Sequence, residues 1–354
     1  MNLLNDIERL VTCESPSTDL AAVARSAEVT AEVGSALLGS PPERIVLDGR
    51  THLRWRLGTG PRKVLLLGHH DTVWPIGTLE RIPFGVRDGV LRGPGCFDMK
   101  TGVVMIFHAI ASLGSPDGVT VLITGDEEIG SPSSRGLIET EAVEHAAVLV
   151  CEASADGGAL KTERKGTSMY EVTLHGRAAH AGLEPERGVN AAVEAAHQVL
   201  AVTRLADPAT GTTVVPTVVS AGTTTNTVPA RARFMVDVRV QTTAEQLRVD
   251  EDFQALRPVL DGAKVEVTGG PNRPPLDLSA SGALFDLASR LLPGLTQASV
   301  GGASDGNFTA GVGVPTLDGL GAVGGGAHAE SEHVLVSEIG PRTELLAALV
   351  RELT

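Results

Sequence analysis

Four short apolar runs, each followed closely by a glycine or an acidic residue, constrain the fold of this chain most strongly. They cover residues 64–67, 119–124, 146–151 and 314–317. Runs of this length without polar alternation are typical of strands buried on both faces of a parallel sheet. A helical pattern at Val103–Leu113 lies between the first two runs. Alternating strands and helices predict an α/β domain with a mostly parallel sheet flanked by helices.

The middle of the chain has a different pattern. Segments that alternate like strands and segments with helical periodicity follow one another there in the order βαββαβ, which is the split βαβ arrangement of a ferredoxin-like domain. A segment rich in Gly and Pro at 269–277 precedes a return to the first pattern. We therefore expect a catalytic domain at residues 1–164 and 274–354, interrupted by a small domain at residues 165–273.

The charge pattern argues against nucleic acid as a partner. The formal net charge is −14, and the sequence has no basic stripe of the kind that follows a phosphate backbone. No apolar stretch approaches the roughly 18 residues that cross a membrane, and the first residues lack the features of a signal peptide. We expect a cytoplasmic protein that binds neither nucleic acid nor membrane.

The cysteines do not form a recognisable framework. There are three, Cys13, Cys96 and Cys151, without CxxC spacing. An odd number in this arrangement argues against disulfides or a structural zinc knuckle. We expect small, buried apolar side chains at these positions.

Several side chains that can bind metal ions follow the predicted strands directly. The carboxyl ends of strands are where ligands bind in open α/β sheets. Glycine-rich loops, which allow close approach of the backbone, carry two further candidates. The set is His69, Asp71, Glu127, Glu128 and Glu152 after the strands, with Asp98 and His328 in the loops.

This combination of donors points to a two-metal hydrolase. Imidazoles and carboxylates without thiolate suit zinc, cobalt or manganese, and so many acids would repel one another without cations. Asp71 can hold the ring of His69 from behind, and the adjacent Glu127 and Glu128 should diverge toward substrate and metal. Each motif alone also has a structural explanation: an HxD motif can be a capped turn, and a Glu pair can begin a solvated helix.

The sequence resembles the co-catalytic zinc metallopeptidases that include glutamate carboxypeptidase, aminoacylase, acetylornithine deacetylase and succinyl-diaminopimelate desuccinylase. The resemblance spans residues 68–334, with the segments in the family's order. The matching segments are GHHDTVWP, GPGCFDMKTG, TGDEEIGS, CEAS, GRAAHAG, NTVPARARFMVDVR, GGASDGNF and GGGAHAESEHV.

The resemblance implies a ligand set for two zinc ions, with cobalt or manganese as possible replacements. His69, Asp98 and Glu152 would bind one ion. Asp98, Glu128 and His328 would bind the other, so that Asp98 bridges the pair.

The resemblance also implies roles outside the ligand set. Asp71 would orient His69, and Glu127 would serve as general base and then general acid. The peptide bond between Asp98 and Met99 would be cis.

Three residues of the small domain complete the implied site. His180 would reach the oxyanion from the partner subunit of a homodimer, although a loop-capping histidine is an alternative. Asn226 and Arg239 would hold the substrate carboxylate, although Arg239 could instead be an outward residue of a strand. His70, Glu330 and His333 are interpreted as structural or surface groups.

The function expected from this resemblance is cleavage of the amide bond in an N-acyl or peptidyl amino acid with a free carboxylate, as in glutamate carboxypeptidase. An N-acyl-amino-acid deacylase similar to acetylornithine deacetylase is the alternative enzyme. A non-catalytic binding protein on the same fold would not need a base at Glu127. A nucleic-acid module at residues 165–273 is opposed by the acidic balance.

Overall fold

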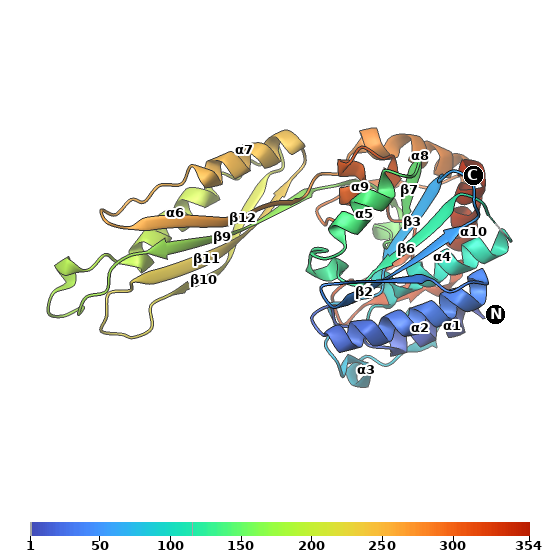
Figure 1. Cartoon of the computed structure of the whole chain (residues 1–354), viewed down its shortest axis with the longest axis horizontal. Coiled ribbons are helices and arrows are strands. Elements are labelled where there is room, and N and C mark those ends of the chain that lie inside the picture. The colour runs from blue at the N-terminus through green and yellow to red at the C-terminus, as the bar shows by residue number, and fades with distance from the viewer. Residues whose placement is uncertain (1, 115) are drawn as a thin grey trace. The chain divides into compact units, whose positions relative to one another are not determined.

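The computed structural model describes residues 2–114 and 116–354, which form two compact units (Figure 1). The larger unit comprises residues up to 164 and from 276 onward, and the smaller unit comprises Lys165–Pro275. The chain therefore leaves the larger unit once and returns to it once. Among the described residues, no helix is long and apolar enough to cross a membrane.

A six-stranded mixed sheet forms the centre of the larger unit. Four neighbouring strands run parallel, and two antiparallel strands extend one edge. All residues of β3, β6 and β7 are buried, as expected for strands covered on both faces. The predicted α/β fold with a mostly parallel sheet is confirmed. In spatial order the strands are β1 (Glu43–Leu47), β2 (Arg50–Leu57), β6 (Val119–Thr124), β3 (Val64–His69), β7 (Ala147–Val150) and β14 (Thr316–Leu317).

Helices pack against both faces of this sheet. Successive side chains of a strand point to opposite faces, so Val64 and Leu66 of β3 join one apolar core while Leu65 and Leu67 join another. The first core is completed by α1 (Leu3–Thr12), α2 (Leu20–Leu38), α4 (Thr101–Ser112), α8 (Leu278–Leu291) and α10 (Val336–Leu353). The second is completed by α5 (Arg135–Ala142) and α9 (Gly306–Gly311).

One close approach in the first core explains a glycine. Gly34 of α2 lies against Trp55 of β2, and a Cβ atom at this position would stand 2.6 Å from Cζ2 of the indole. The indole in turn meets Phe107 of α4 edge-on, with 5.2 Å between the ring centroids. The absence of a side chain at Gly34 therefore lets α2 pack closely over the aromatic pair.

Short strands connect the loops that border the central sheet. A second sheet joins the turn before α4 to the loop before α10. Its strands, in spatial order, are β15 (Gly324–Gly325), β16 (His333–Leu335), β5 (Val90–Arg92) and β4 (Gly85–Arg87). Elsewhere β13 (Gln297–Val300) pairs in parallel with β8 (Leu160–Arg164), and α3 (Thr78–Arg81) forms one further turn.

The smaller unit is a four-stranded antiparallel sheet packed against two helices (Figure 1). The predicted βαββαβ order is confirmed. Its apolar core includes Tyr170 and Phe253, whose rings stack with their centroids 3.9 Å apart. The strands, in spatial order, are β10 (Thr213–Ala221), β11 (Arg231–Val240), β9 (Gly166–His175) and β12 (Lys264–Arg273), and the helices are α6 (Ala191–Thr203) and α7 (Thr243–Gln254).

Candidate metal centre

The ends of three neighbouring parallel strands bring the expected polar residues together in the larger unit. His69 is the last residue of β3, and Asp71 follows it. Glu127 begins a short helical turn after β6, and Glu152 follows β7. Because β6, β3 and β7 are adjacent and parallel, these side chains meet at one edge of the sheet.

Asp98 lies between two imidazoles. Its Oδ1 atom is 3.5 Å from Nε2 of His69, and its Oδ2 atom is 3.4 Å from Nε2 of His328. Asp98 lies in the turn before α4, and the peptide bond that follows it is cis, as the resemblance predicted. The two oxygens of this carboxylate thus face histidines on different segments of the chain.

Two further carboxylates extend the cluster on either side of Asp98. The Nε2 atom of His69 lies 3.5 Å from Oε1 of Glu152, and the Nε2 atom of His328 lies 3.0 Å from Oε2 of Glu128. The structure therefore brings together all five side chains that the resemblance assigned as ligands.

Ligand atoms in this cluster are close enough to share an ion. Those of His69, Asp98 and Glu128 lie within 4.8 Å of one another, and so do those of His69, Glu127 and Glu152. The second group brings Glu127, which was expected to be the general base, beside two expected ligands.

The residues present fit a divalent cation. Within the described ranges, the buried atoms Nε2 of His69 and Oε1 of Glu128 have no hydrogen-bond partner, whereas buried polar atoms normally have one. Nitrogen and carboxylate oxygen donors without sulfur are those that zinc, cobalt and manganese accept. The unpartnered buried atoms and the donor types together indicate that the cluster can hold metal ions.

Burial and the charges of neighbouring groups shift the pKa values of the cluster. Burial, followed by the charge of Asp98, raises the pKa of Glu128 to about 7, although contact with His328 opposes this. Asp98 and Glu128 in turn raise the pKa of His328 to about 10. Without a metal ion the cluster therefore retains protons, and a cation can replace them.

Asp71 holds several parts of the centre in place. Its Oδ1 atom lies 3.3 Å from Nδ1 of His69, on the side of the ring away from Asp98. Its two oxygens also accept hydrogen bonds from the backbone N–H groups of Glu127 and Glu128, each at 3.2 Å. The hydroxyl of Ser17, a residue that the sequence analysis did not single out, donates to Oδ2 at 2.6 Å. Asp71 therefore fixes one histidine and the turn that carries both glutamates.

The three expected residues of the smaller unit lie at two different ends of its sheet. The backbone N–H of Ala181 donates to the carbonyl oxygen of Asn226 at 2.9 Å, so the loops of His180 and Asn226 are neighbours. Arg239 pairs in register with Thr167 at the other end of β11, where its guanidinium binds both oxygens of Asp237 at 2.8 Å. The structure brings His180 close to Asn226 but does not bring Arg239 close to either within one chain.

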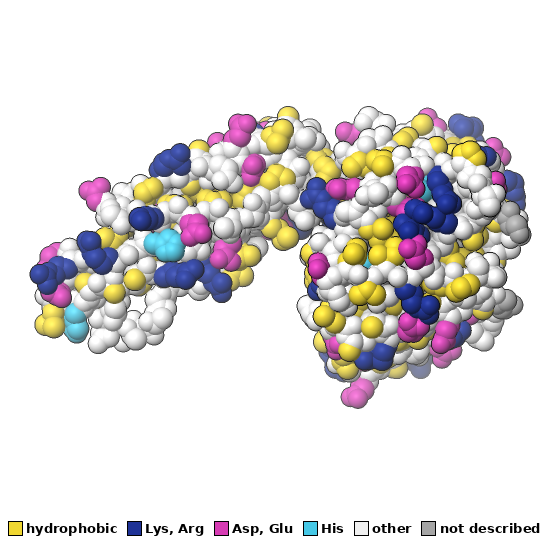
Figure 2. Space-filling model, in the orientation of Figure 1, with side chains coloured by type: hydrophobic (Ala, Val, Ile, Leu, Met, Phe, Trp, Pro, Cys, Tyr) yellow, Lys and Arg dark blue, Asp and Glu magenta, His cyan; other side chains and the backbone are white. Residues whose placement is uncertain are grey.

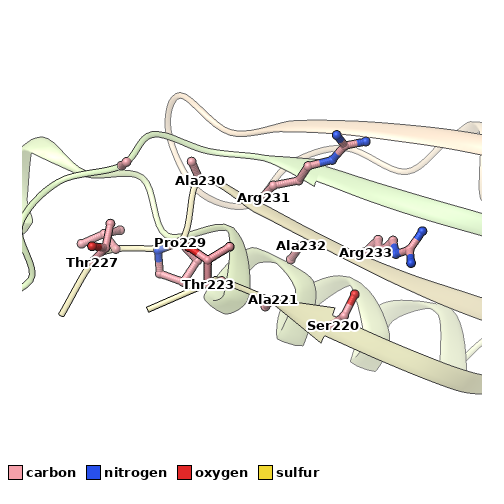
Figure 3. A pocket seen from close by; sticks show the side chains of 12 residues that line it. Ser220, Ala221, Thr223, Thr227, Pro229, Ala230, Arg231, Ala232 and Arg233 are labelled. Atoms are coloured by element: carbon pink, nitrogen blue, oxygen red, sulfur yellow. The ribbon is translucent and has the colours of Figure 1, made fainter. Parts of the chain in front are cut away.

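A cavity of about 510 Å³ lies beside the loop that carries Asn226 (Figure 3). Small side chains, including Ala221 and Ala232, form part of its wall, and Thr227 lines it from the loop. Arg231 and Arg233 also contribute to its lining. This cavity belongs to the smaller unit alone.

The groups interpreted as structural lie away from the cluster or are buried. Nε2 of His70 is 3.0 Å from the carbonyl oxygen of Thr51, and burial lowers its pKa to about 4. Glu330 is exposed and pairs with Arg81 at 2.6 Å. Cys96 and Cys151 are buried, and burial raises the pKa of both thiols, which disfavours the reactive thiolate.

A family model described as peptidase family M20/M25/M40 matches residues 65–352. The chain belongs to this family. It is therefore a metal-dependent hydrolase of the peptidase and amidohydrolase class, and the resemblance seen in the sequence is confirmed.

On the face shown in Figure 2, acidic and basic side chains are interspersed without an extended basic tract.

Relatives of the M20 enzyme include two named hydrolases. Carboxypeptidase G2 of Pseudomonas sp. (strain RS-16) is 33% identical over 303 residues, covering 78% of this chain and 70% of the relative. Succinyl-diaminopimelate desuccinylase of Acinetobacter baylyi is 29% identical over 298 residues, covering 76% of each chain.

Solved structures share the fold of this M20 enzyme at low sequence identity. The M20 family metallo-carboxypeptidase Sso-CP2 from Sulfolobus solfataricus superposes with a TM-score of 0.76 at 17% identity, over 100% of both chains. Aminopeptidase PepT from Bacillus cereus has a TM-score of 0.73 at 22% identity, over 99% of this chain and 98% of the other.

Proposed function

We propose that this M20 enzyme is a dizinc hydrolase that cleaves the amide bond of an N-acyl or peptidyl amino acid with a free carboxylate, like a glutamate carboxypeptidase. The position of Asp98 between His69 and His328 carries the proposal, because a carboxylate whose two oxygens face separate imidazoles can bridge two ions. The similarity to carboxypeptidase G2 supports the substrate class.

In this proposal His69, Asp98 and Glu152 hold one ion, and Asp98, Glu128 and His328 hold the other. Zinc is the proposed metal, and cobalt or manganese suits the same donors. Bound divalent cations would polarise the carbonyl of the amide and lower the pKa of an attacking water molecule.

Glu127 is the proposed general base and acid. Its side chain is largely buried at the same edge of the sheet, and its backbone N–H is fixed by Asp71. Its carboxylate accepts the proton of the attacking water and then delivers it to the leaving amine. The hydrogen bond to Asp71 fixes the backbone of Glu127 beside the cluster.

The proposed carboxylate pocket and oxyanion contact involve two subunits. Arg239 lies at the end of β11 that adjoins the connection to the larger unit, since its partner Thr167 follows that connection closely. His180 and Asn226 lie past the other end of the sheet, and a ten-residue strand such as β9 spans roughly 33 Å. We therefore propose that Arg239 and Asn226 come from different subunits when they hold the substrate carboxylate, and that His180 comes from the same subunit as Asn226.

The surface of the smaller unit supports a homodimer. Helix α6 exposes Val193 and Leu200, with 44% and 60% of their surface accessible. The adjacent edge strand β10 exposes Val218 and Val219, at 55% and 58%. An exposed apolar helix face beside an unpaired strand edge is a surface that proteins usually cover.

The second candidate is an N-acyl-amino-acid deacylase of the acetylornithine deacetylase type. The 29% identity to succinyl-diaminopimelate desuccinylase favours it. Both reactions cleave an amide beside a carboxylate, so the metal centre is common to them.

Hydrolysis of a matched substrate panel tests the proposal. The panel pairs peptidyl, benzoyl, acetyl and succinyl groups with glutamate and with a basic amino acid, each as the free acid and as the α-carboxamide. The proposed function requires cleavage of peptidyl- or aroyl-glutamate, loss of cleavage for the carboxamides, and loss of activity on chelation. Preference for acetyl or succinyl conjugates of a basic amino acid would favour the deacylase, and equal cleavage of the carboxamides would exclude recognition of the carboxylate.

A further inference from the structure

Glu332 is a fully buried carboxylate that binds the turn carrying Asp98. Its Oε1 atom accepts hydrogen bonds from the backbone N–H groups of Phe97 and Asp98, at 2.8 and 3.1 Å. Its Oε2 atom accepts hydrogen bonds from the N–H of Gly95 and from Nε1 of Trp74, at 2.9 and 2.7 Å. Its side chain has no measurable exposure. Four N–H donors therefore converge on one carboxylate directly behind the cluster.

The position of Glu332 in the chain links this turn to a second part of the cluster. Glu332 lies in the loop that carries His328, immediately before β16. Its backbone N–H donates to the carbonyl oxygen of Ala329 at 2.8 Å, which closes the loop on itself. The same residue thus fixes the backbone of Asp98 and the loop of His328, the pair whose side chains lie 3.4 Å apart.

The hydrogen bonds of Glu332 to the turn and the loop explain a buried carboxylate at this position better than packing in an apolar core does. No ion pair of Glu332 occurs in the part of the chain that the structure describes, and a buried carboxylate without a counter-ion is costly. Hydrogen bonds from several N–H groups can offset that cost, as around Asp71. An apolar side chain would fill the space without ordering the turn.

We propose that Glu332 is a positioning residue of the metal centre. Its carboxylate holds the Asp98 turn and the His328 loop in fixed positions relative to each other, so that both ligands are arranged before an ion binds. Asp71 performs the equivalent task for His69 and for the turn of Glu127 and Glu128. This inference rests on the proposed two-metal site.

Zinc affinity, measured on the full chain by competition with a chromogenic chelator, tests the inference. Glu332→Gln replaces one acceptor oxygen by an NH₂ group that faces N–H donors, so the turn must rearrange. We expect zinc binding to weaken by about 10–100-fold, the usual effect of removing a residue that supports a ligand. The absorption spectrum of the cobalt-loaded protein should also change, which a loss of stability alone would not cause.

Glu330→Gln is the matched control, because Glu330 lies in the same loop but is exposed and forms an ion pair with Arg81. It should leave zinc affinity and the cobalt spectrum unchanged. Glu332→Asp, which keeps the charge, should recover part of the affinity. If Glu332→Gln does not fold, Trp74→Phe removes one donor to Oε2 and should weaken zinc binding several-fold.

The outcomes separate this inference from the function on which it rests. Wild-type protein that binds zinc, together with unchanged affinity and cobalt spectrum in Glu332→Gln, would overturn the positioning role and leave the proposed function intact. If Glu332→Gln does not fold but Trp74→Phe does, unchanged zinc affinity in Trp74→Phe would overturn the positioning role. Wild-type protein that binds no zinc would contradict the metal centre itself.

Discussion

The Nε2 atom of His328 lies 3.0 Å from Oε2 of Glu128, in a contact between the loop before β16 and the turn after β6. The side chain of His328 is 53% exposed, whereas that of His69 is 1% exposed. The two halves of the cluster therefore differ in access to solvent. An ion held by His328 can exchange more readily than one held by His69.

Substitution of His328 by alanine should remove one ion and leave the other. The proposed ligands of the buried half, His69, Asp98 and Glu152, do not include His328. We expect the variant to retain about one zinc per chain after dialysis, measured by elemental mass spectrometry, because coordination of one ion is lost. Release of both ions by His328→Ala would show that the halves are not separable in this way.

Substitution of Glu127 by glutamine should strongly lower turnover without removing metal. A general base contributes about 10²–10⁴-fold to the rate, so kcat should fall by at least that factor. The measurement is kcat together with metal content. Loss of an ion from Glu127→Gln would instead make Glu127 a ligand, the arrangement that its proximity to His69 and Glu152 also allows.

Substitution of Leu200 by aspartate should weaken the proposed homodimer. Leu200 is exposed on α6, and a charge there would be buried without a partner in the proposed interface. We expect a monomer by light scattering, with a loss of activity because His180 no longer reaches a partner's site. Leu247→Asp, at an exposed position of α7 in the same unit, is the control. A monomeric wild type with full activity would remove His180 from the mechanism.

The stability of the larger unit should depend on pH through Glu141. Burial raises the pKa of Glu141, but hydrogen bonds from Arg56 and Arg54 outweigh burial and leave it below its usual value. A folded-state pKa below the unfolded value stabilises the protein above the unfolded pKa, and this contribution is lost as the pH falls through the folded pKa.

We therefore expect Glu141→Gln to lower the free energy of unfolding by roughly 1.5–3 kcal/mol at neutral pH, the range for hydrogen bonds to charged groups. The difference should shrink in acid, below the usual glutamate pKa of about 4.3. Urea unfolding of both proteins over this range measures it. A difference that stays constant with pH would rule out ionisation of Glu141 as its source.

The parts of the fold that could be predicted are those whose signal is local in the sequence. β3 is a buried run, and His69 ends it, so the strand and its ligand could be recognised together. The β1–β2 hairpin was not predicted, because Glu43–Leu47 is only partly buried and its apolar run is limited to Ile45–Leu47. Edge strands of this kind are specified by pairing with a neighbour rather than by their own residues.

The supporting contacts of the cluster could not be predicted because they join distant segments. Glu332 and Asp98 are 234 residues apart in sequence. Nothing in the loop sequence distinguished Glu332 from Glu330, which faces solvent. Asn226 and Arg239 were predicted to hold the same substrate carboxylate. Within one chain they lie at opposite ends of the small sheet, separated by the length of the ten-residue strand β11, and this separation could not be seen in the sequence.

The metal content of the purified protein, combined with activity before and after chelation, is the most direct test of the proposed two-metal hydrolase. Asp98 can act as a bridging ligand only if two ions bind, so we expect about two zinc equivalents per chain and activity that is lost on chelation and restored by zinc or cobalt. One ion per chain with full activity, or cleavage that persists without metal, would contradict it.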